Sequence, residues 1–539
     1  MTVARRTKER KAMARQESED RIVPEGPRKL APTRELQEPE GGKAIPVEER
    51  TRQPSLPFPT AEGSPPTAGN VADGTDEDLS SPAPLATPKG ESRVRKRASA
   101  TMEEIVERLR AAFDKVASNK GAPGPDRQSI DEVRAHLGTL LPQLTKELLK
   151  GTYQPGLIRR VYIPKGSGGQ RGLGIPNVVD RMIGEAVRQV LEPLYEPTFH
   201  ASSHGFRPNR SCHTAIREAC QHVLAGYEWV VDLDLEKYFD RVNHQRLMAQ
   251  LARRIEDRRV LVLIGRMLKA RVVLPDGVVV NTKEGVPQGG PLSPLLSNIV
   301  LDELDRELDQ RGHRFVRYAD DCNIYVRSER AGHRVKASIT AFIERRLRLK
   351  VNQAKSAVDL PENRHFLGFR LRFRPEDGEV EVLLSKRTRN RIKTRIRELT
   401  PRTWGNTLEA CITKVNEYLV GWMGFFGICS GREKTTFVDL EKHTRRRLRA
   451  LQLKHWKRKR TIARKLIQLG ARPENAWGTV YGAQRSIWRL SHVPVVDQTL
   501  TKAYFRRQGL VSLVDLWDQA HQRIVAPVQL SLWPGEARS

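Results

Sequence analysis

Two adjacent aspartates, Asp320 and Asp321, are the residues whose types and spacing most directly suggest chemistry. They lie in VRYADDCNIYV at 316–326, between two apolar runs typical of β-strands, so a hairpin turn is expected. Neighbouring carboxylates raise each other's pKa unless a cation lies between them, and oxygen ligands of this kind suit Mg²⁺. The alternative is an ordinary solvated turn, because aspartate is a common turn residue.

A second acidic strand end favours the metal interpretation. The stretch VVDLDLEKYFDRVNH at 230–244 places Asp232 and Asp234 two residues apart, hence on one face of a strand. Either carboxylate reaches the Asp320 turn if the two strands are neighbours in a sheet. A two-metal phosphoryl-transfer site needs such carboxylates: one ion activates a 3′-hydroxyl, and the other stabilises the leaving pyrophosphate. The alternative for Asp232 is a plain surface charge.

The elements that must position these acids alternate between helical and strand patterns from 130 to about 380, which indicates an α+β domain. Ahead of it, a helix is expected at 101–116, where Thr101 and Glu104 form a capping box. Beyond about 385 the chain changes to basic helices. In one of them, at 407–426, apolar residues recur at three- and four-residue steps and form one helix face: Ile412, Val415, Leu419, Trp422 and Phe426.

The composition predicts a polyanionic partner. The net charge is +30 and the pI about 10.2, and an excess of this size favours nucleic acid, because phosphate contacts release condensed counterions. No apolar run approaches the roughly 20 residues of a membrane span, so no membrane is expected as a partner. The five cysteines include no CxxC pair, and free thiols indicate a reducing cytoplasm.

Residues 1–98 differ from the rest of the chain. They contain 13 of the 33 prolines and a single aromatic residue, Phe58. A stretch of this composition cannot bury a core, so a disordered extension is expected.

The ordered motifs resemble a reverse transcriptase. YADD at 318–321 follows DLEKYFD at 234–240 and VPQGGPLSPLLSNIVLDELD at 286–305. Five further blocks resemble, in order, those of the bacterial group II intron-encoded type: GAPGPDRQSIDE at 121–132, YIPKGSGGQRGLGIPNVVDRM at 162–182, SHGFRPNRSCHTAI at 203–216, LKVNQAKSAV at 349–358 and HFLGFRLRF at 365–373.

The resemblance spans about 100 to 500 and implies a right-hand polymerase. Its parts would be fingers at 99–225, an α+β, ferredoxin-like palm at 226–380, a helical thumb and maturase domain at 381–500, and a C-terminal tail at 501–539. The family often carries a C-terminal endonuclease with paired cysteines. No cysteine follows residue 500, so the endonuclease-less type is expected.

The resemblance also assigns roles. Asp234, rather than Asp232, matches the first catalytic aspartate, and Asp320 and Asp321 match the other two. A further metal ligand would be the backbone carbonyl of Leu235. The nucleotide site would comprise Phe239, which excludes a 2′-hydroxyl, Gln288 and Gly289 beside the base, Lys165 and Arg171 on the triphosphate, and Lys355, which protonates pyrophosphate. From the residues alone, these positions are typical of a core phenylalanine, ordinary turns and a solvated lysine.

Two further groups of cations would contact nucleic acid. Arg207 and Arg210 of GFRPNRS would touch template or primer. The cationic run KHTRRRLRALQLKHWKRKR at 442–460 would bind RNA, with Arg445, Arg446, Lys457 and Arg458 as candidate contacts. The alternative for such a run is a solvated helix face.

We therefore expect an RNA-directed DNA polymerase that uses two Mg²⁺ ions and deoxynucleoside triphosphates. It would extend a DNA primer on an RNA template, assist splicing of its intron RNA, and insert that intron at a DNA target. Two alternatives remain open: a splicing-only, RNA-binding maturase with an idle polymerase, and a retron or CRISPR-associated reverse transcriptase.

Overall fold

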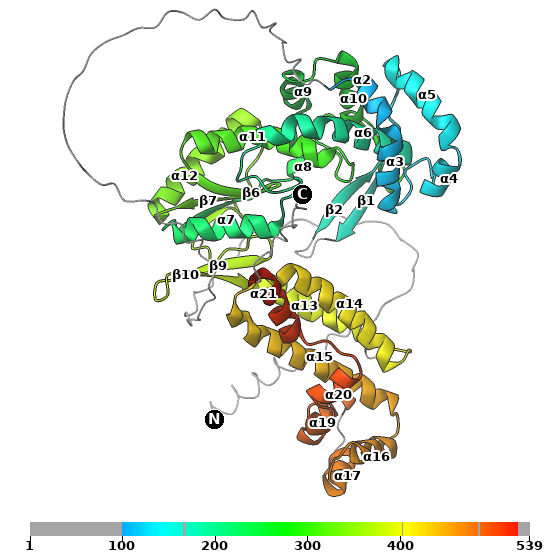
Figure 1. The fold of residues 1–539 in the computed structure, drawn as a ribbon, viewed down its shortest axis with the longest axis vertical. Coiled ribbons are helices and arrows are strands. Elements are labelled where there is room, and N and C mark those ends of the chain that lie inside the picture. Colours follow the sequence, from blue (N-terminus) through cyan, green and yellow to red (C-terminus); the bar gives the residue numbers. More distant parts are fainter. Residues whose placement is uncertain (1–99, 165–168, 402, 483–485, 526–539) are drawn as a thin grey trace, which may run out of the picture. The chain divides into compact units, whose positions relative to one another are not determined.

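The computed structural model describes residues 100–164, 169–401, 403–482 and 486–525 (Figure 1). All of these belong to one unit of the chain, 53–539. The proline-rich extension at 1–98 and Lys165 lie outside the described residues.

The first part is a group of helices beside a four-stranded sheet. The capping box at Thr101 is confirmed: its hydroxyl accepts from the Glu104 N–H, and the Glu104 carboxylate accepts from the Thr101 N–H. The single helix expected at 101–116 is divided at Arg108, whose N–H bonds the carbonyls of Ile105 and Val106 and tightens the turn. The helices are α2 (Met102–Glu107), α3 (Leu109–Ser118), α4 (Ile130–Ala135), α5 (Leu137–Leu149) and α6 (Val178–Tyr195).

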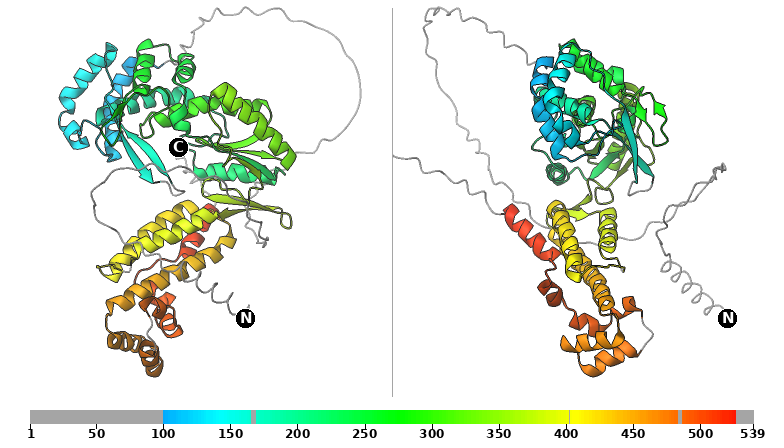
Figure 2. Two further views of the ribbon diagram at one scale, coloured as in Figure 1. Left: turned by 180° about the vertical axis from the view of Figure 1, so that it is seen from behind. Right: turned by 90° about the vertical axis from the view of Figure 1, so that its right-hand side faces the viewer.

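The sheet of this part has the strand order β2-β1-β4-β5. Its longest pair is an antiparallel hairpin that runs out from the helices, as Figure 2 shows from behind. The strands are β1 (Ile158–Pro164), β2 (Gln170–Ile175), β4 (Val272–Val273) and β5 (Val279–Val280).

A second four-stranded sheet, in the order β6-β7-β3-β8, carries the acidic motifs. Its strands are β3 (Trp229–Leu233), β6 (Arg314–Tyr318), β7 (Asp321–Val326) and β8 (Ala357–Asp359). The hairpin at YADD is confirmed, since Tyr318 pairs with Asp321. The strands β3 and β7 are antiparallel neighbours in which Leu233 pairs with Cys322, so the end of β3 meets the YADD turn.

The two faces of this sheet join different cores. Val231 and Ile324 pack with α11 (Ser293–Gln310) and α12 (Glu329–Phe342), whereas Val230 and Tyr325 pack with α7 (Cys212–Leu224) and the helices after residue 385. The helices on opposite faces are visible in Figure 1. The remaining elements here are η1 (Glu196–Thr198), α8 (Tyr238–Arg241), α9 (His244–Ala252), α10 (Arg258–Leu268) and η2 (Ile343–Leu347).

A two-stranded hairpin, β9 (Phe369–Arg374) and β10 (Glu379–Leu384), leads into the helical part. The expected apolar face of α14 is buried at Ile412, Val415 and Leu419. The helices are α13 (Lys386–Leu399), α14 (Leu408–Phe426), η3 (Gly431–Glu433), α15 (Lys434–His455), α16 (Lys459–Gln468), α17 (Pro473–Tyr481), α18 (Ile487–Leu490), α19 (Pro494–Thr499), α20 (Lys502–Arg507) and α21 (Leu513–Val525).

The segment expected to be a C-terminal tail differs from that expectation as far as residue 525. Helix α21 packs against α14 and α15, and the Trp517 indole N–H donates to the Cys429 carbonyl at 2.8 Å. Ser512 just before it donates to the buried carboxylate of Glu441 at 2.7 Å. These residues are part of the helical core, because their apolar face is buried there. Within the described part of the chain, no helix is both long and apolar enough to cross a membrane.

Candidate active site

Three aspartates meet where β3 ends and the YADD turn begins. Asp234 directly follows β3, Asp320 lies in the turn between β6 and β7, and Asp321 begins β7. Because β3 and β7 are paired, the structure brings together the three residues that were expected to act together. Asp234 and Asp320 line an open pocket with about 1040 Å³ of space not filled by protein atoms.

The carboxylates repel one another. Desolvation, followed by Asp320, Asp232 and Asp234, raises the pKa of Asp321 to about 7. Desolvation also raises the pKa of Asp320, and its own backbone N–H and Arg171 act in the opposite direction. Since Asp321 is exposed to solvent on one side, water screens part of this repulsion. The arrangement favours a bound cation.

Asp232 and Asp234 have different partners although they are two residues apart. Arg364 donates two hydrogen bonds to Asp232, at 2.6 and 3.0 Å, and forms a salt bridge with it. The Asp234 carboxylate instead lies 3.5 Å from the Lys355 ammonium, which is 65% exposed. Asp232 is therefore neutralised within the fold, and Asp234 is left facing the pocket.

The backbone of Asp234 is fixed by the segment that follows η2. Its N–H donates to the Ser356 hydroxyl at 2.9 Å, and its carbonyl accepts from the Asn352 N–H at 2.8 Å. Leu235 and Val351 form an isolated antiparallel bridge of the type whose own N–H and C=O groups point away from the partner strand. The Leu235 carbonyl therefore points away from Val351.

Four of the expected nucleotide-binding residues, Arg171, Phe239, Gln288 and Lys355, line the same pocket. Arg171 on β2 donates to the Gln288 side chain at 2.8 Å, and both border the pocket together with Lys355. Gly289 has φ +124° and lies so close to β2 that an added Cβ would stand 2.6 Å from the Gly174 carbonyl oxygen. Only glycine fits there, so the PQGG turn is held against β2.

Phe239 and its neighbour Tyr238 differ in their hydrogen bonding. Tyr238 is 2% exposed, and its hydroxyl donates to the Ser297 carbonyl at 2.9 Å. Phe239 is 7% exposed and its side chain has no polar atom to be bound, and both residues line the pocket. Its backbone carbonyl accepts from the Val286 N–H at 2.6 Å, which ties it to the PQGG segment.

Comparisons with known proteins identify the family. A family model described as reverse transcriptase (RNA-dependent DNA polymerase) matches residues 163–371, and one described as group II intron, maturase-specific domain matches 389–468. Protein YkfC of Escherichia coli (strain K12) is 37% identical over 308 residues, covering 49% of this chain and 81% of that protein. The chain belongs to the group II intron-encoded reverse transcriptases.

Further relatives agree with this family. The group II intron-encoded protein LtrA of Lactococcus lactis subsp. cremoris is 35% identical to this reverse transcriptase over 262 residues. The match covers 45% of this chain and 43% of LtrA. Among solved structures, a chain of a partial Cas6-RT-Cas1–Cas2 complex has 24% identity and a TM-score of 0.31, covering 49% of this chain and 45% of that one.

A polymerase of this family depends on a divalent metal, so the side chains of this site must be able to hold such an ion. In the part of the reverse transcriptase that the structure describes, no three acidic, histidine or cysteine side chains converge closely enough to hold an ion alone. Mg²⁺, however, keeps several waters and is usually held by one or two carboxylates together with substrate phosphates. The repelling carboxylates of Asp320 and Asp321 beside an open pocket fit that mode of binding.

Some of the cations expected to contact nucleic acid are bound within the fold, and others are exposed. The Arg207 side chain is 5% exposed and bonds Glu196 and the carbonyls of His200 and Ser203. As it lies here, Arg207 braces its loop rather than presenting a cation to phosphate. Arg210 donates to the Ala201 carbonyl and keeps part of its surface exposed.

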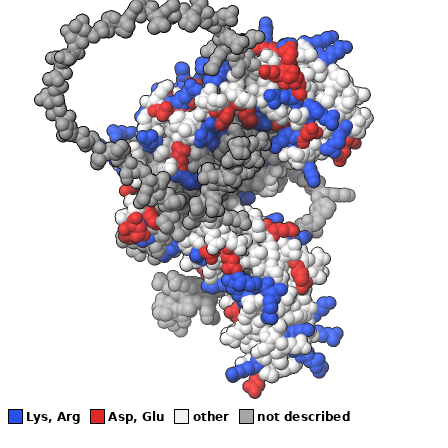
Figure 3. All heavy atoms as spheres, viewed as in Figure 1, with Lys and Arg blue, Asp and Glu red and all other residues white. Residues whose placement is uncertain are grey.

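The helical part also contains both bound and exposed cations. Arg445 is bound to Glu441 at 3.2 Å, and the Arg446 guanidinium lies 4.3 Å from the centre of the Trp488 ring. Lys457 and Arg458 are exposed, at the break between α15 and α16. Figure 3 shows Lys and Arg side chains gathered over these two helices.

Sequence reasoning missed the residues that support the site. Arg364 and Ser356 were not singled out, although they neutralise Asp232 and hold the backbone of Asp234. Ser356 adjoins Lys355 in the block LKVNQAKSAV, so its position beside a lysine that was itself a candidate was the available signal. Nothing in the sequence pairs Arg364 with an aspartate 132 residues away.

Proposed function

We propose that this reverse transcriptase joins deoxynucleotides to a primer 3′-hydroxyl through two Mg²⁺ ions held by Asp234, Asp320, Asp321 and the Leu235 carbonyl. The observation that carries the proposal is the meeting of three carboxylates, two of them with raised pKa, beside one pocket. When bound, the ions activate the hydroxyl and stabilise the charge that develops on the phosphate. Every other contribution comes from side chains around the pocket.

The residues that line the pocket have separate roles in this proposal. Arg171 draws the triphosphate toward the sheet, and its bond to Gln288 holds the amide beside the incoming base. Phe239 fills the space that a ribose 2′-hydroxyl needs. Lys355, 3.5 Å from Asp234 and largely exposed, donates a proton to the leaving pyrophosphate.

Primer extension by the purified protein on an RNA template tests the proposal. Extension requires Mg²⁺ and is lost in the Asp320→Ala, Asp321→Ala variant, while binding of RNA to the helical part is unchanged. Extension that survives this double substitution would refute the site.

The second part of the proposed function is assistance to splicing. The helical part matches the maturase-specific domain over residues 389–468, which supports an intron RNA as the partner over a retron or CRISPR array. Exposed cations on α15 and α16 contact the RNA backbone, and reverse splicing followed by target-primed synthesis inserts the intron into DNA. Splicing of an intron RNA encoded beside the gene, measured with and without the protein, tests this part. If the polymerase-inactive variant also fails to splice, the two activities are not separable.

A further inference from the structure

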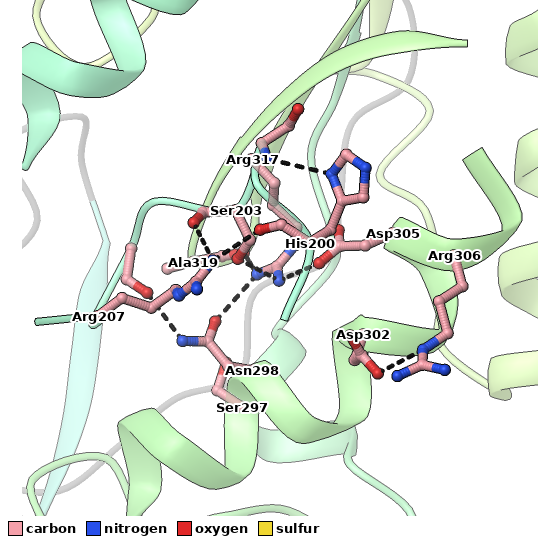
Figure 4. A network of polar contacts seen from close by, with 12 residues as sticks. His200, Ser203, Arg207, Ser297, Asn298, Asp302, Asp305, Arg306, Arg317 and Ala319 are labelled. Carbon is pink, nitrogen blue, oxygen red and sulfur yellow. Dashed lines mark hydrogen bonds and ion pairs between the residues drawn. The ribbon is translucent and has the colours of Figure 1, made fainter. Parts of the chain in front are cut away.

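A buried arginine lies directly beneath the catalytic turn. Arg317 on β6 is 0% exposed and stands three residues before Asp320. Its Nε and Nη2 atoms donate to the two carboxylate oxygens of Asp305 at 2.6 and 2.5 Å, and Asp305 is also 0% exposed. The remaining donors reach the Ser203 hydroxyl at 2.7 Å, the Asn298 side-chain oxygen at 3.1 Å and the Ala319 carbonyl at 2.9 Å (Figure 4).

Stability alone does not account for this pair. Replacing a buried ion pair with apolar residues of similar volume is often neutral or stabilising, because taking both charges out of water is costly. The hydrogen bonds from Arg317 to Ser203, Asn298 and Ala319 have no apolar equivalent, and the one to the Ala319 carbonyl reaches into the turn itself. Ala319 has φ +57°, a left-handed conformation that L-residues other than glycine, asparagine and aspartate seldom adopt.

The other side of the turn is also held. A Cβ on Gly205 would lie 2.2 Å from the Ala319 backbone nitrogen, so the two backbones are in direct contact. Asn298 joins both sides, since its amide donates to the Gly205 carbonyl at 2.8 Å while its oxygen accepts from Arg317. The YADD turn is thus fixed between the Gly205 backbone and the Arg317 guanidinium.

The contacts of Arg317, Asn298 and Gly205 around the YADD turn form a clamp. Helix α11 connects this clamp to the rest of the site. It supplies Asn298 and Asp305, and its first residue, Ser293, donates to the Pro287 carbonyl beside Gln288 at 2.6 Å. The Ser297 carbonyl on the same helix accepts from Tyr238, next to Phe239. One helix therefore contacts the PQGG turn, the Phe239 segment and the arginine that holds YADD.

We propose that Arg317, held by Asp305 and Asn298 of α11, is a positioning residue that fixes the Ala319 carbonyl and thereby the direction of the Asp320 and Asp321 carboxylates. The inference rests on the proposed catalytic role of that pair. Arg317 touches neither substrate nor metal; it acts through the turn. Without it, Ala319 relaxes toward an ordinary conformation and the carboxylates lose their alignment.

The test replaces the ion pair by an apolar one. The double variant Arg317→Met, Asp305→Leu leaves no unpaired buried charge and removes the clamp. We expect kcat for incorporation of one nucleotide to fall on the order of 100-fold, the effect of a misplacement of about 1 Å. KM for the deoxynucleotide and affinity for RNA stay unchanged, because Arg171 and the helical part are untouched. An unchanged kcat in a folded double variant overturns the proposal.

Two further variants sharpen the result. Arg317→Lys keeps the positive charge but cannot reach four acceptors at once, so kcat stays low; recovery of kcat means that charge alone matters and overturns the positioning role. Arg449→Met is the control: Arg449 is also buried and is bound to Asp497 in the helical part, so its loss lowers the melting temperature and leaves kcat unchanged.

If the double variant fails to fold, shown by loss of its cooperative urea unfolding transition, Asn298→Ala decides the question. It removes no charge and still loosens both sides of the turn, so kcat falls with RNA affinity intact, and an unchanged kcat refutes the proposal. Failure of the proposed active site is recognised separately. In that case the Asp320→Ala, Asp321→Ala variant retains extension.

Discussion

Asp305 on α11 and Asp321 at the start of β7 each contact a residue of β6, yet they meet opposite conditions. Asp305 is fully buried, and Arg317 binds both of its oxygens. Asp321 is exposed, the charges that act most strongly on its pKa are those of other aspartates, and no salt bridge to it occurs in the described residues. The pair Asp232 and Asp234 repeats the contrast, since only Asp232 is bound by an arginine.

The contrast separates charges that the fold neutralises from charges that it leaves unbalanced. A buried carboxylate with a complete set of partners is stable only in that arrangement, so removing one partner is costly. A carboxylate among like charges, beside an open pocket, destabilises the fold unless something binds there. A bound cation would relieve the repulsion among these carboxylates.

The largest difference is expected between Asp321→Asn and Asp305→Asn. The first removes a proposed metal ligand and should lower the rate of primer extension by roughly 10³-fold or more, since the ions would supply several kcal/mol of charge stabilisation. The second breaks a buried pair and lowers the free energy of unfolding by about 3–5 kcal/mol. Single-nucleotide incorporation and urea denaturation measure the two effects. Equal losses of stability in both variants would contradict the comparison.

A smaller difference is expected between the neighbours Phe239 and Tyr238. Phe239→Ala opens the pocket wall, and the preference for deoxynucleotides over ribonucleotides falls by about 10², the discrimination that a shaped pocket supplies against one hydroxyl. Competition between the two triphosphates in a single-turnover assay measures it. Tyr238→Phe is the matched control: it loses only the bond to the Ser297 carbonyl, so selectivity stays the same. A Phe239→Ala variant with unaltered selectivity would show that the ring is only a core residue.

The pH dependence of stability distinguishes the two kinds of carboxylate further. The folded-state pKa of Asp321 is raised from 3.8 to about 7, so between these pH values the folded protein holds a proton that the unfolded chain has lost. The free energy of unfolding therefore falls as the pH rises through this window. Asp321→Asn removes the effect, so relative to the wild type it is more stable at pH 8 than at pH 4.

Thermal melts in EDTA at several pH values measure this gain, which solvent screening keeps modest because Asp321 is exposed. Added Mg²⁺ at pH 8 should raise the melting temperature of the wild type more than that of Asp321→Asn. An identical pH profile for the two proteins would mean that the aspartates do not repel one another in solution.

Local patterns in the sequence predicted local structure. The capping box at Thr101 and the YADD hairpin depend on residues within a few positions, and both are present. Ion pairing could not be predicted in this way. Arg364 lies 132 residues from Asp232, so sequence spacing could not show which of the two aspartates is neutralised. That choice was left to the resemblance.

Because sequence spacing does not show which distant residues pair, neither the clamp around Arg317 nor the partners of the basic residues could be predicted. Ser203 lies 114 residues from Arg317, so a buried site for an arginine in VRYADD was not foreseeable. A cation in a basic run looks the same whether it is free or bound. Arg207 and Arg445 were grouped with Lys457 and Arg458, and the fold then placed the first two against glutamates.

The smallest effect concerns these cations and extends the comparison to RNA binding. Lys457 and Arg458 are exposed, whereas Arg445 is 13% exposed and bound to Glu441. Each lysine or arginine on a phosphate contributes about one unit to the slope of log K against log salt. Lys457→Ala, Arg458→Ala should therefore flatten that slope by up to about 2 between roughly 50 and 200 mM salt, as measured by filter binding.

Arg445→Ala should leave the slope unchanged and lower the melting temperature, because it frees a buried glutamate. The opposite pattern, a flatter slope only for Arg445→Ala, would mean that Arg445 leaves Glu441 when RNA binds, and that pairing in the free protein does not mark a charge as structural.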